Sequence, residues 1–397
     1  MSRFGKSLST LQIPSVSGIS KRIHGMTWQA YPVGLGTATG YILLSALKPH
    51  PKFLLPLEIA LFIINIIVFS LTTGLLTVQA ILYPRQFRRV ALDPNKNSFI
   101  PTSVLVFATL IVGLVNFCTG WSNSIRTHDF FWIYVSLAVF VSFTVLIIWF
   151  SSPRNPWAFP VFPLLLTGVV TFNVLKIIPL TDPRAVSIFI TGLFMFGGGA
   201  FMCIFYLVSY LIMSTGFLDG HQANGAFIAA GPPGFSALII FNFGKIAATL
   251  LPAHELISPN AGEIWQVTGS IFVGTMLTGC SAVLFILAAI PYWSRIHKHL
   301  NEVLGCWATT FPNIGLILSL RFLGDTFKSD LILAFQTVLT IMVFTVYLIV
   351  FVLTIMAVWK GLVLVSDDKA VYLDSLEIES PKDVEKGGHG AAGHGKH

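Results

Sequence analysis

Residues 331–363 read LILAFQTVLTIMVFTVYLIVFVLTIMAVWKGLV and contain one charged side chain, Lys360. An α-helix needs about 20 mainly apolar residues to cross a bilayer, so this stretch predicts a transmembrane helix. Similar stretches recur along the chain. They predict ten spans, at roughly 28–47, 53–83, 101–121, 129–151, 157–178, 185–214, 225–251, 264–293, 304–323 and 331–363. The sequence therefore predicts an all-α integral membrane protein.

The composition indicates that lipid surrounds most of the chain. Of its 397 residues, 54% are hydrophobic and 10% are charged, and the mean hydropathy is +0.79. A soluble domain carries far more charge on its surface. This balance excludes an ordinary soluble protein.

The distribution of basic residues predicts the orientation. Sixteen lysines and arginines lie in the N-terminal segment, in the loops on the same side and in the C-terminal part from Lys360 onward, whereas five lie in the opposite loops. Because cytoplasmic loops carry the excess of Lys and Arg, we predict cytoplasmic termini. We divide the chain into an N-terminal tail (1–26), a ten-helix transmembrane domain (27–364) and a disordered C-terminal tail (365–397) that is too poor in apolar groups to fold.

The sequence favours no enzymatic activity, and we expect no cofactor, metal or nucleic-acid partner. The four cysteines lie in apolar spans without CxxC or His-linked spacing, which favours packing roles. The glycines at 197–199 lack the Gly-Lys-Ser/Thr ending of a nucleotide-binding loop. No cluster of His, carboxylate or Cys groups lies in the spans, as a membrane enzyme would require.

The ten spans alternate in character. The even-numbered spans are long and nearly free of proline, whereas the odd-numbered spans contain interruptions at Gly34–Gly40, Pro101–Ser103, Phe159–Pro163, Gly231–Phe235 and Thr309–Gly315. Interrupted backbone is tolerated at membrane depth only where it faces protein or a watery cavity. Gly and Pro are also common in membrane helices generally, but their recurrence on alternate spans predicts five kinked inner helices ringed by five smooth outer ones.

The charges within the spans point to an anion. Lys176, Lys245 and Arg321 lie near the C-terminal ends of the fifth, seventh and ninth spans and predict a basic pore mouth. Alternatively, these side chains snorkel or complement the helix dipole. The five inner spans contain no Asp, Glu or His, and we interpret Glu58, near the start of an outer span, as interfacial.

The interruptions also supply candidate pore-lining groups. A helix that restarts after a kink presents free N–H groups and a partial positive charge, which suits a carboxylate. We expect the substrate to meet such helix ends and the side chains around them, at Gly36, Thr37, Thr39, Pro163, Pro232, Pro233, Ser236, Thr309, Thr310, Pro312 and Asn313. A monoanion suits this pore best, because desolvating two charges costs more than desolvating one. Any accompanying proton would then ride on the substrate.

The run Trp307–Gly315, which contains Phe311-Pro312-Asn313-Ile314-Gly315, resembles the tellurite-resistance/dicarboxylate transporter family. This family includes plant slow anion channels, fungal sulfite efflux pumps and fungal malic-acid permeases. The resemblance covers roughly residues 25–362. It implies a quasi-fivefold arrangement of ten helices around a central pore, a homotrimer with one pore per subunit, and a gate formed by Phe311.

Within the family, the sequence resembles the malic-acid permeases through Phe311–Gly315, Gly231–Phe235 and the Tyr83-Pro84-Arg85 turn. It departs from the family at the first span, which usually reads closer to Met-Gly-Thr-Gly, and at Cys306-Trp307, where an aromatic pair is expected. The resemblance implies a plasma-membrane carrier for malate and related C4-dicarboxylates. The alternative is a sulfite efflux pump or a nitrate or chloride channel on the same scaffold.

Overall fold

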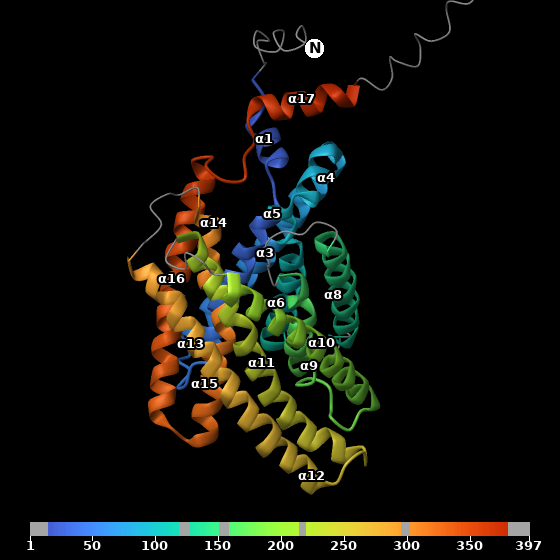
Figure 1. Ribbon diagram of the computed structural model, residues 1–397, viewed down its shortest axis with the longest axis vertical. Coiled ribbons are helices and arrows are strands. Elements are labelled where there is room, and N and C mark those ends of the chain that lie inside the picture. Colours follow the sequence, from blue (N-terminus) through green and yellow to red (C-terminus); the bar gives the residue numbers. More distant parts are fainter. Residues whose placement is uncertain (1–14, 119–126, 151–158, 214–219, 295–301, 380–397) are drawn as a thin grey trace, which may run out of the picture.

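The computed structural model describes residues 15–118, 127–150, 159–213, 220–294 and 302–379, and every regular element in these ranges is helical (Figure 1). Within them, eight helices are long and apolar enough to cross a membrane, and α9 is a shorter apolar helix. Every predicted span contains one of the helices. The prediction of an all-α membrane protein is therefore confirmed.

Five helices form an inner ring. Their bounds are α2 (Tyr31–Ser45), α6 (Ile100–Phe117), α9 (Phe162–Val174), α11 (Gly220–Ala253) and α15 (Ile314–Phe327). Helix α2 contacts α6, α6 contacts α9, α9 contacts α11, α11 contacts α15, and α15 contacts α2. These contacts close the ring.

Each inner helix is followed in the chain by an outer helix that packs against it. The outer helices are α3 (Leu54–Leu82), α8 (Thr127–Phe150), α10 (Pro183–Met213), α13 (Val273–Ser294) and α16 (Asp330–Trp359). They expose large apolar side chains, for example Leu71, Phe194 and Leu331. An apolar outer surface of this extent suits contact with lipid.

The outer helices turn polar side chains toward the ring. Glu58, Asn65, Thr72 and Gln79 of α3 are all buried. The Asn65 Nδ2 donates hydrogen bonds to Tyr41 Oη and Thr109 Oγ1, at 3.3 and 3.2 Å. A polar group facing hydrocarbon would lose such partners at a cost of several kcal/mol. The polar stripe on α3 therefore fixes which of its faces packs inward.

The predicted kinks in the inner helices are only partly present. Helix α2 runs without a break through Gly34–Gly40. Helices α6 and α9 begin at their prolines, with Pro101 and Pro163 in the first turn. Proline is tolerated there because a first-turn N–H has no intrahelical partner. These prolines therefore mark helix starts, after the 3₁₀ turn η2 (Phe159–Val161) in the case of α9.

Helix α11 continues through Pro232 and Pro233. Hydroxyl groups of neighbouring helices compensate beside the proline pair, where Ser281 Oγ donates to the Ala230 carbonyl at 2.7 Å and Ser319 Oγ to the Gly234 carbonyl at 3.2 Å. The expectation that all outer helices are smooth is also wrong. Helix α12 (Pro259–Ile264) passes into α13 through the π-helical stretch η3 (Trp265–Phe272).

The predicted break before α15 is present. Helix α14 (Val303–Cys306) gives way to two 3₁₀ turns, η5 (Trp307–Thr309) and η6 (Phe311–Asn313), before α15 starts. Thr310 between them has φ −104° and ψ −84°, outside the helical range. Of the five predicted kinks, this one interrupts its helix within the described residues.

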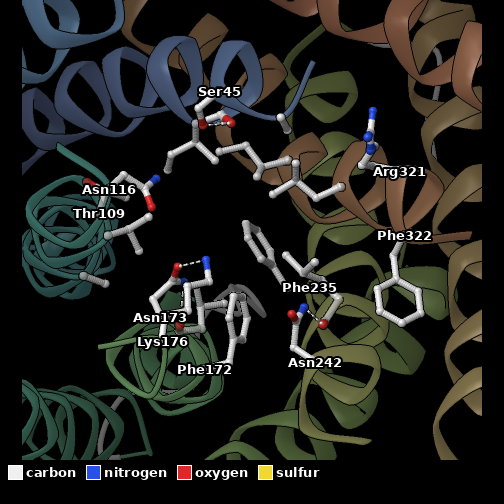
Figure 2. A pocket seen from close by; sticks show the side chains of 18 of the residues that line it. Ser45, Thr109, Asn116, Phe172, Asn173, Lys176, Phe235, Asn242, Arg321 and Phe322 are labelled. Carbon is white, nitrogen blue, oxygen red and sulfur yellow. Dashed lines mark hydrogen bonds between the residues drawn. The ribbon is translucent and has the colours of Figure 1, made fainter. Parts of the chain in front are cut away.

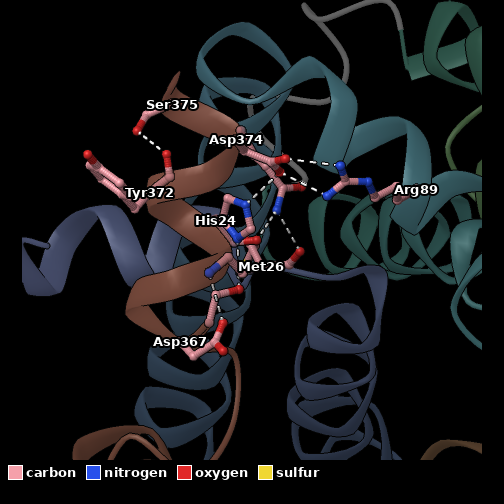
Figure 3. A network of polar contacts seen from close by, with 10 residues as sticks. His24, Met26, Arg89, Asp367, Tyr372, Asp374 and Ser375 are labelled. Atoms are coloured by element: carbon pink, nitrogen blue, oxygen red, sulfur yellow. Dashed lines mark hydrogen bonds and ion pairs between the residues drawn. The ribbon is translucent and has the colours of Figure 1, made fainter. Parts of the chain in front are cut away.

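The C-terminal segment forms a helix next to the N-terminal segment. Helix α17 (Asp368–Glu379) contacts α1 (Gly18–His24), at the same end of the molecule as α4 (Pro84–Leu92) and α5 (Pro94–Asn97) (Figures 1 and 3). Buried Asp374 accepts hydrogen bonds from His24 Nε2 at 3.0 Å and Arg89 Nη1 at 3.1 Å. A hydrogen bond from Lys21 lowers the pKa of Asp368.

The prediction of a disordered tail is therefore wrong for residues 368–379. Composition alone did not reveal the charged partners that α17 finds on α1 and α4. The rest of that predicted tail, residues 380–397, and the first 14 residues lie outside the described part of the chain.

Candidate functional site

A cavity of about 550 Å³ lies toward the C-terminal ends of the inner helices (Figure 2). Each inner helix contributes at least one polar side chain to its wall, and five of these, one from each helix, surround the cavity. These residues are Ser45 of α2, Asn116 of α6, Asn173 of α9, Asn242 of α11 and Arg321 of α15. Figure 2 shows them arranged around a common space, and we call them the polar ring. The volume falls within the range of small-molecule sites.

Phe311 lies on the wall of this cavity and is 8% exposed. Its ring centroid is 5.2 Å from that of Phe235, which also lines the cavity. The two aromatic rings therefore pack against each other between α11 and the turn before α15, where an apolar constriction stays a prediction. Phe311 is the one member of the predicted gate and pore lining that the structure places on the cavity wall.

Packing of the neighbouring tryptophan supports the turn that carries Phe311. The Trp307 Nε1 donates to Thr354 Oγ1 of α16 at 3.1 Å, and Thr310 Oγ1 donates to the Trp307 carbonyl at 2.7 Å. The Trp307 ring lies so close to Gly36 of α2 that a Cβ there would come within 2.1 Å of it. Gly36 therefore makes room for this tryptophan.

Arg321 is 7% exposed and lies on the cavity wall. Its Nε donates to Asp325 Oδ2 at 2.9 Å, and Lys48 Nζ reaches the same oxygen at 3.1 Å. Its two terminal nitrogens, Nη1 and Nη2, are buried without a hydrogen-bond partner among the described residues. A guanidinium group in this state can bind a carboxylate or another planar anion through two parallel hydrogen bonds.

Lys176 is the second cation on the wall. Its Nζ donates to Asn173 Oδ1 at 2.7 Å and lies 5.6 Å from the centre of the Phe172 ring. The structure thus brings Lys176 and Arg321 to one cavity (Figure 2). Lys245, the third residue of the predicted basic mouth, is exposed on α11 and is not part of the wall.

The wall also contains acidic and titratable groups, one of which contradicts the sequence interpretation. Glu58 is 1% exposed and accepts a hydrogen bond from His50 Nε2 at 2.7 Å. Both residues line the cavity, so Glu58 is buried within the protein, and its interfacial depth stays a prediction. Helix α15 extends to Phe327 and therefore includes Asp325, which the predicted span omitted. The expectation that the inner helices contain no acid is wrong at Asp325.

The other predicted pore-lining residues are packed away from this wall. Their hydroxyl groups are engaged within their own helices or turns, where Thr37 donates to the Val33 carbonyl, Thr39 to Leu35 and Thr309 to Cys306. The set that does not reach the cavity is Gly36, Thr37, Thr39, Pro163, Pro232, Pro233, Ser236, Thr309, Thr310, Pro312 and Asn313.

The polar ring could have been found from a repeat in the sequence. Asparagine lies next to phenylalanine in three inner helices, at Asn116-Phe117, Phe172-Asn173 and Asn242-Phe243. Each Asn lies 9 to 15 residues after the proline of its span. A single Asn in an apolar span has little meaning, but its recurrence marks one level of the bundle.

The direction of the inner helices also bears on the expected source of the positive charge. Carbonyl groups at helix C-terminal ends carry a partial negative charge. Because the cavity lies toward these ends, helix dipoles oppose the binding of an anion there. Lys176 and Arg321 offset this effect with full charges. Of the two predicted sources of positive charge, basic side chains and helix breaks, the structure places the side chains Lys176 and Arg321 on this wall.

No group of three or more His, Cys, Asp or Glu side chains in the described ranges could hold a metal ion. The four cysteines are free thiols, of which Cys203 is buried. The chemistry of the cavity therefore comes from its amides, its cations and the His50–Glu58 pair.

Comparison with known proteins identifies the family. A sulfite efflux pump from Arthroderma otae is 24% identical over 340 residues, which are 82% of this chain and 88% of that protein. A putative malic acid transport protein from Schizosaccharomyces pombe is 22% identical over 360 residues (86% and 81%). A second malic acid transport protein from this yeast is 23% identical over 313 residues (75% and 70%).

Relatives named as sulfite efflux pumps and relatives named as malic acid transport proteins thus match this chain at nearly the same identity. Each match covers most of the relative's length. Residues 25–355 match the voltage-dependent anion channel family, which covers all of the inner and outer helices except the last residues of α16. The chain therefore belongs to this family of membrane anion transporters and channels, as its Phe-Pro-Asn-x-Gly motif predicted.

Proposed function

We propose that the protein carries malate and related C4-dicarboxylates, as monoanions, through the cavity and past Phe311. The observation that carries the proposal is Arg321, which lines a cavity that also contains Lys176 and whose buried Nη1 and Nη2 have no hydrogen-bond partner among the described residues. Buried N–H groups without acceptors are costly, and an incoming carboxylate that reached them would supply the missing hydrogen bonds.

The polar ring favours a substrate with a second polar end. A hydrogen-malate ion has one carboxylate, one carboxylic acid and one hydroxyl group. The carboxylate suits the Arg321 fork, while the neutral end suits amides such as Asn116 and Asn242 on the other helices of the wall. An inorganic anion would use the guanidinium but has no second polar end to meet these amides.

The charges on the wall favour a monoanion. Lys176 and Arg321 are opposed by Asp325 and Glu58, so the cavity offers little excess positive charge for a dianion. Desolvating the second charge of a dianion would add a cost that these side chains do not offset.

The wider arrangement belongs to the same proposal. We place ten helices across the plasma membrane, with α2 and α9 among them, in a quasi-fivefold arrangement around the pore. The termini then lie in the cytoplasm and the cavity opens to the outside. The exposed apolar faces of the outer helices contact lipid, and copies of the chain assemble as a homotrimer through part of that surface.

Transport by purified protein in liposomes tests the substrate. Uptake of labelled malate should saturate, and succinate should compete with it. Arg321→Gln should raise the half-saturating concentration, whereas Lys245→Gln, which alters a cation outside the cavity, should not. Saturable sulfite uptake with no malate uptake would overturn the malate assignment.

Sulfite efflux is the second candidate, with nitrate or chloride conduction on the same scaffold. Relatives named as sulfite efflux pumps match this chain as well as those named as malic acid transport proteins. Expression in a sulfite-sensitive deletion strain separates the two functions. Restored sulfite resistance without malate uptake would support the second candidate.

A further inference from the structure

The His50–Glu58 pair lies on the wall of the cavity, and the transport scheme above uses only the negative charge of Glu58. Glu58 belongs to the outer helix α3, and its side chain is 2% exposed. His50 comes from the loop before α3, and its side chain is 33% exposed. The pair therefore joins a buried carboxylate to an imidazole that solvent in the cavity can reach.

Other charged groups face the same space. Lys176 comes from the end of α9, and Arg321 and Asp325 come from α15. Lys48, in the loop that carries His50, binds Asp325. With a neutral His50, the two cations on the wall are balanced by Asp325 and Glu58. One proton on the pair leaves the wall with one net positive charge.

We propose that the His50–Glu58 pair is a proton-binding site that sets the affinity of the cavity for its anion. This inference rests on the proposed transport function. A proton on His50 Nε2 neutralises the Glu58 carboxylate across the 2.7 Å contact, so the carboxylate no longer opposes an anion in the cavity. Imidazole is the side chain that changes charge most readily around neutral pH, which makes a His–carboxylate pair a candidate proton site.

Linkage gives the proposal a second consequence. If the proton strengthens binding of the anion, the anion must strengthen binding of the proton by the same factor. Binding of anion to the purified protein should therefore take up protons from a weakly buffered solution. The pH dependence then belongs partly to the protein and not only to the substrate.

The test uses monoanions whose charge is fixed between pH 5 and 7.5, namely nitrate and the monomethyl ester of malate. Uptake is measured in liposomes at equal internal and external pH. For the unmodified protein, the half-saturating concentration should rise on the order of tenfold from pH 5 to pH 7.5, a typical coupling between sites. Since the anion does not titrate, this change reports on the protein.

Two variants should hold the cavity in its weak-binding and its strong-binding state, respectively, at every pH. His50→Gln keeps the Glu58 charge but removes the imidazole, so the affinity should stay at the weak value of pH 7.5 throughout. His50→Gln combined with Glu58→Gln removes both titrating groups and the negative charge. Its affinity should stay near the strong value of pH 5 at every pH, a gain that damage to the fold would not produce.

His128→Gln is the matched control, because His128 pairs with Asp129 at 2.8 Å but does not line the cavity. It should keep the pH dependence of the unmodified protein. A pH-independent affinity in the unmodified protein, or pH dependence retained by both His50 variants, overturns this inference and leaves anion transport intact. Absence of flux with either anion and with malate overturns the proposed function and this inference with it.

Discussion

The inner and outer helices are both apolar, the outer ones more so, and they occupy different environments. In their most apolar windows, 61–67% of the residues in the α6, α11 and α15 spans are buried inside the protein, against 28–33% in the outer spans. Helix α9 is buried along its whole length. Lipid therefore contacts most of the surface of the outer helices, whereas the surface of the inner helices contacts other helices.

This difference indicates where small residues are needed for close packing of the helices. Apolar burial does not distinguish protein from lipid, so helices associate in membranes through close packing and polar contacts. The backbones of α11 and α15 touch at Gly234 and Gly315, where a Cβ on Gly315 would lie 2.3 Å from the Phe235 nitrogen. Around Gly279 of the outer helix α13, nothing lies within 4 Å of such a Cβ.

The largest expected effect comes from this pair of glycines. Gly315→Ala should lower the melting temperature of the purified protein sharply, because the methyl group meets backbone atoms that cannot rotate away. Overpacking of this kind costs about 1–3 kcal/mol or more. Gly279→Ala, with the same chemical change on an outer helix, should leave the melting temperature nearly unchanged. Equal effects of the two substitutions would remove the distinction between the rings.

The second prediction concerns the constriction. Phe311→Ala removes a ring that packs 5.2 Å from Phe235 and should raise passive anion flux on the order of tenfold, since an apolar constriction limits wetting of a pore. Phe335→Ala on the outer helix α16, where the side chain is 53% exposed, should not change the flux. A folded Phe311 variant with unchanged or lower flux would remove the gate assignment.

The third prediction separates the predicted basic residues. Arg321→Gln should raise the half-saturating concentration of anion by about tenfold at low salt, and Lys176→Gln somewhat less. Lys245→Gln should have little effect, because Lys245 is exposed outside the cavity. The differences should shrink in 1 M salt, where the Debye length is about 3 Å. An equal loss for all three variants would favour long-range attraction over binding in the cavity.

The sequence predicted the fold well because membrane spans follow from composition. Ten apolar stretches were sufficient to place the helices, and the Pro-rich motifs separated inner spans from outer ones. The same Gly and Pro residues were predicted to line the pore, but they do not lie on the wall of the cavity. Gly36 accommodates the Trp307 ring, and Pro163 starts a helix. These roles depend on partners from distant parts of the chain.

The candidate site was harder to predict for a related reason. Which side of a helix faces the axis depends on packing, and an inner helix is apolar all round. Glu58 belongs to an outer span, yet the start of α3 reaches the cavity beside His50. Only the Phe and the two basic residues were placed correctly, because an aromatic gate motif and charges within apolar spans are conspicuous in any sequence.

The smallest expected effect tests whether outer helices do more than shield the ring from lipid. The Thr354 hydroxyl of α16 accepts the Trp307 Nε1 hydrogen bond, and Trp307 in turn supports the turn that carries Phe311. Thr354→Val keeps the side-chain shape but leaves the buried indole N–H without an acceptor, which costs about 1–3 kcal/mol. Thr345→Val is the control on the same helix, since the exposed Thr345 hydroxyl donates to the Ile341 carbonyl of its own helix. We expect a modest fall in melting temperature and a small rise in anion leak for Thr354→Val, and neither for Thr345→Val.

The two measurements are needed together, because lost stability without added leak would show that α16 holds the bundle together but does not position the constriction.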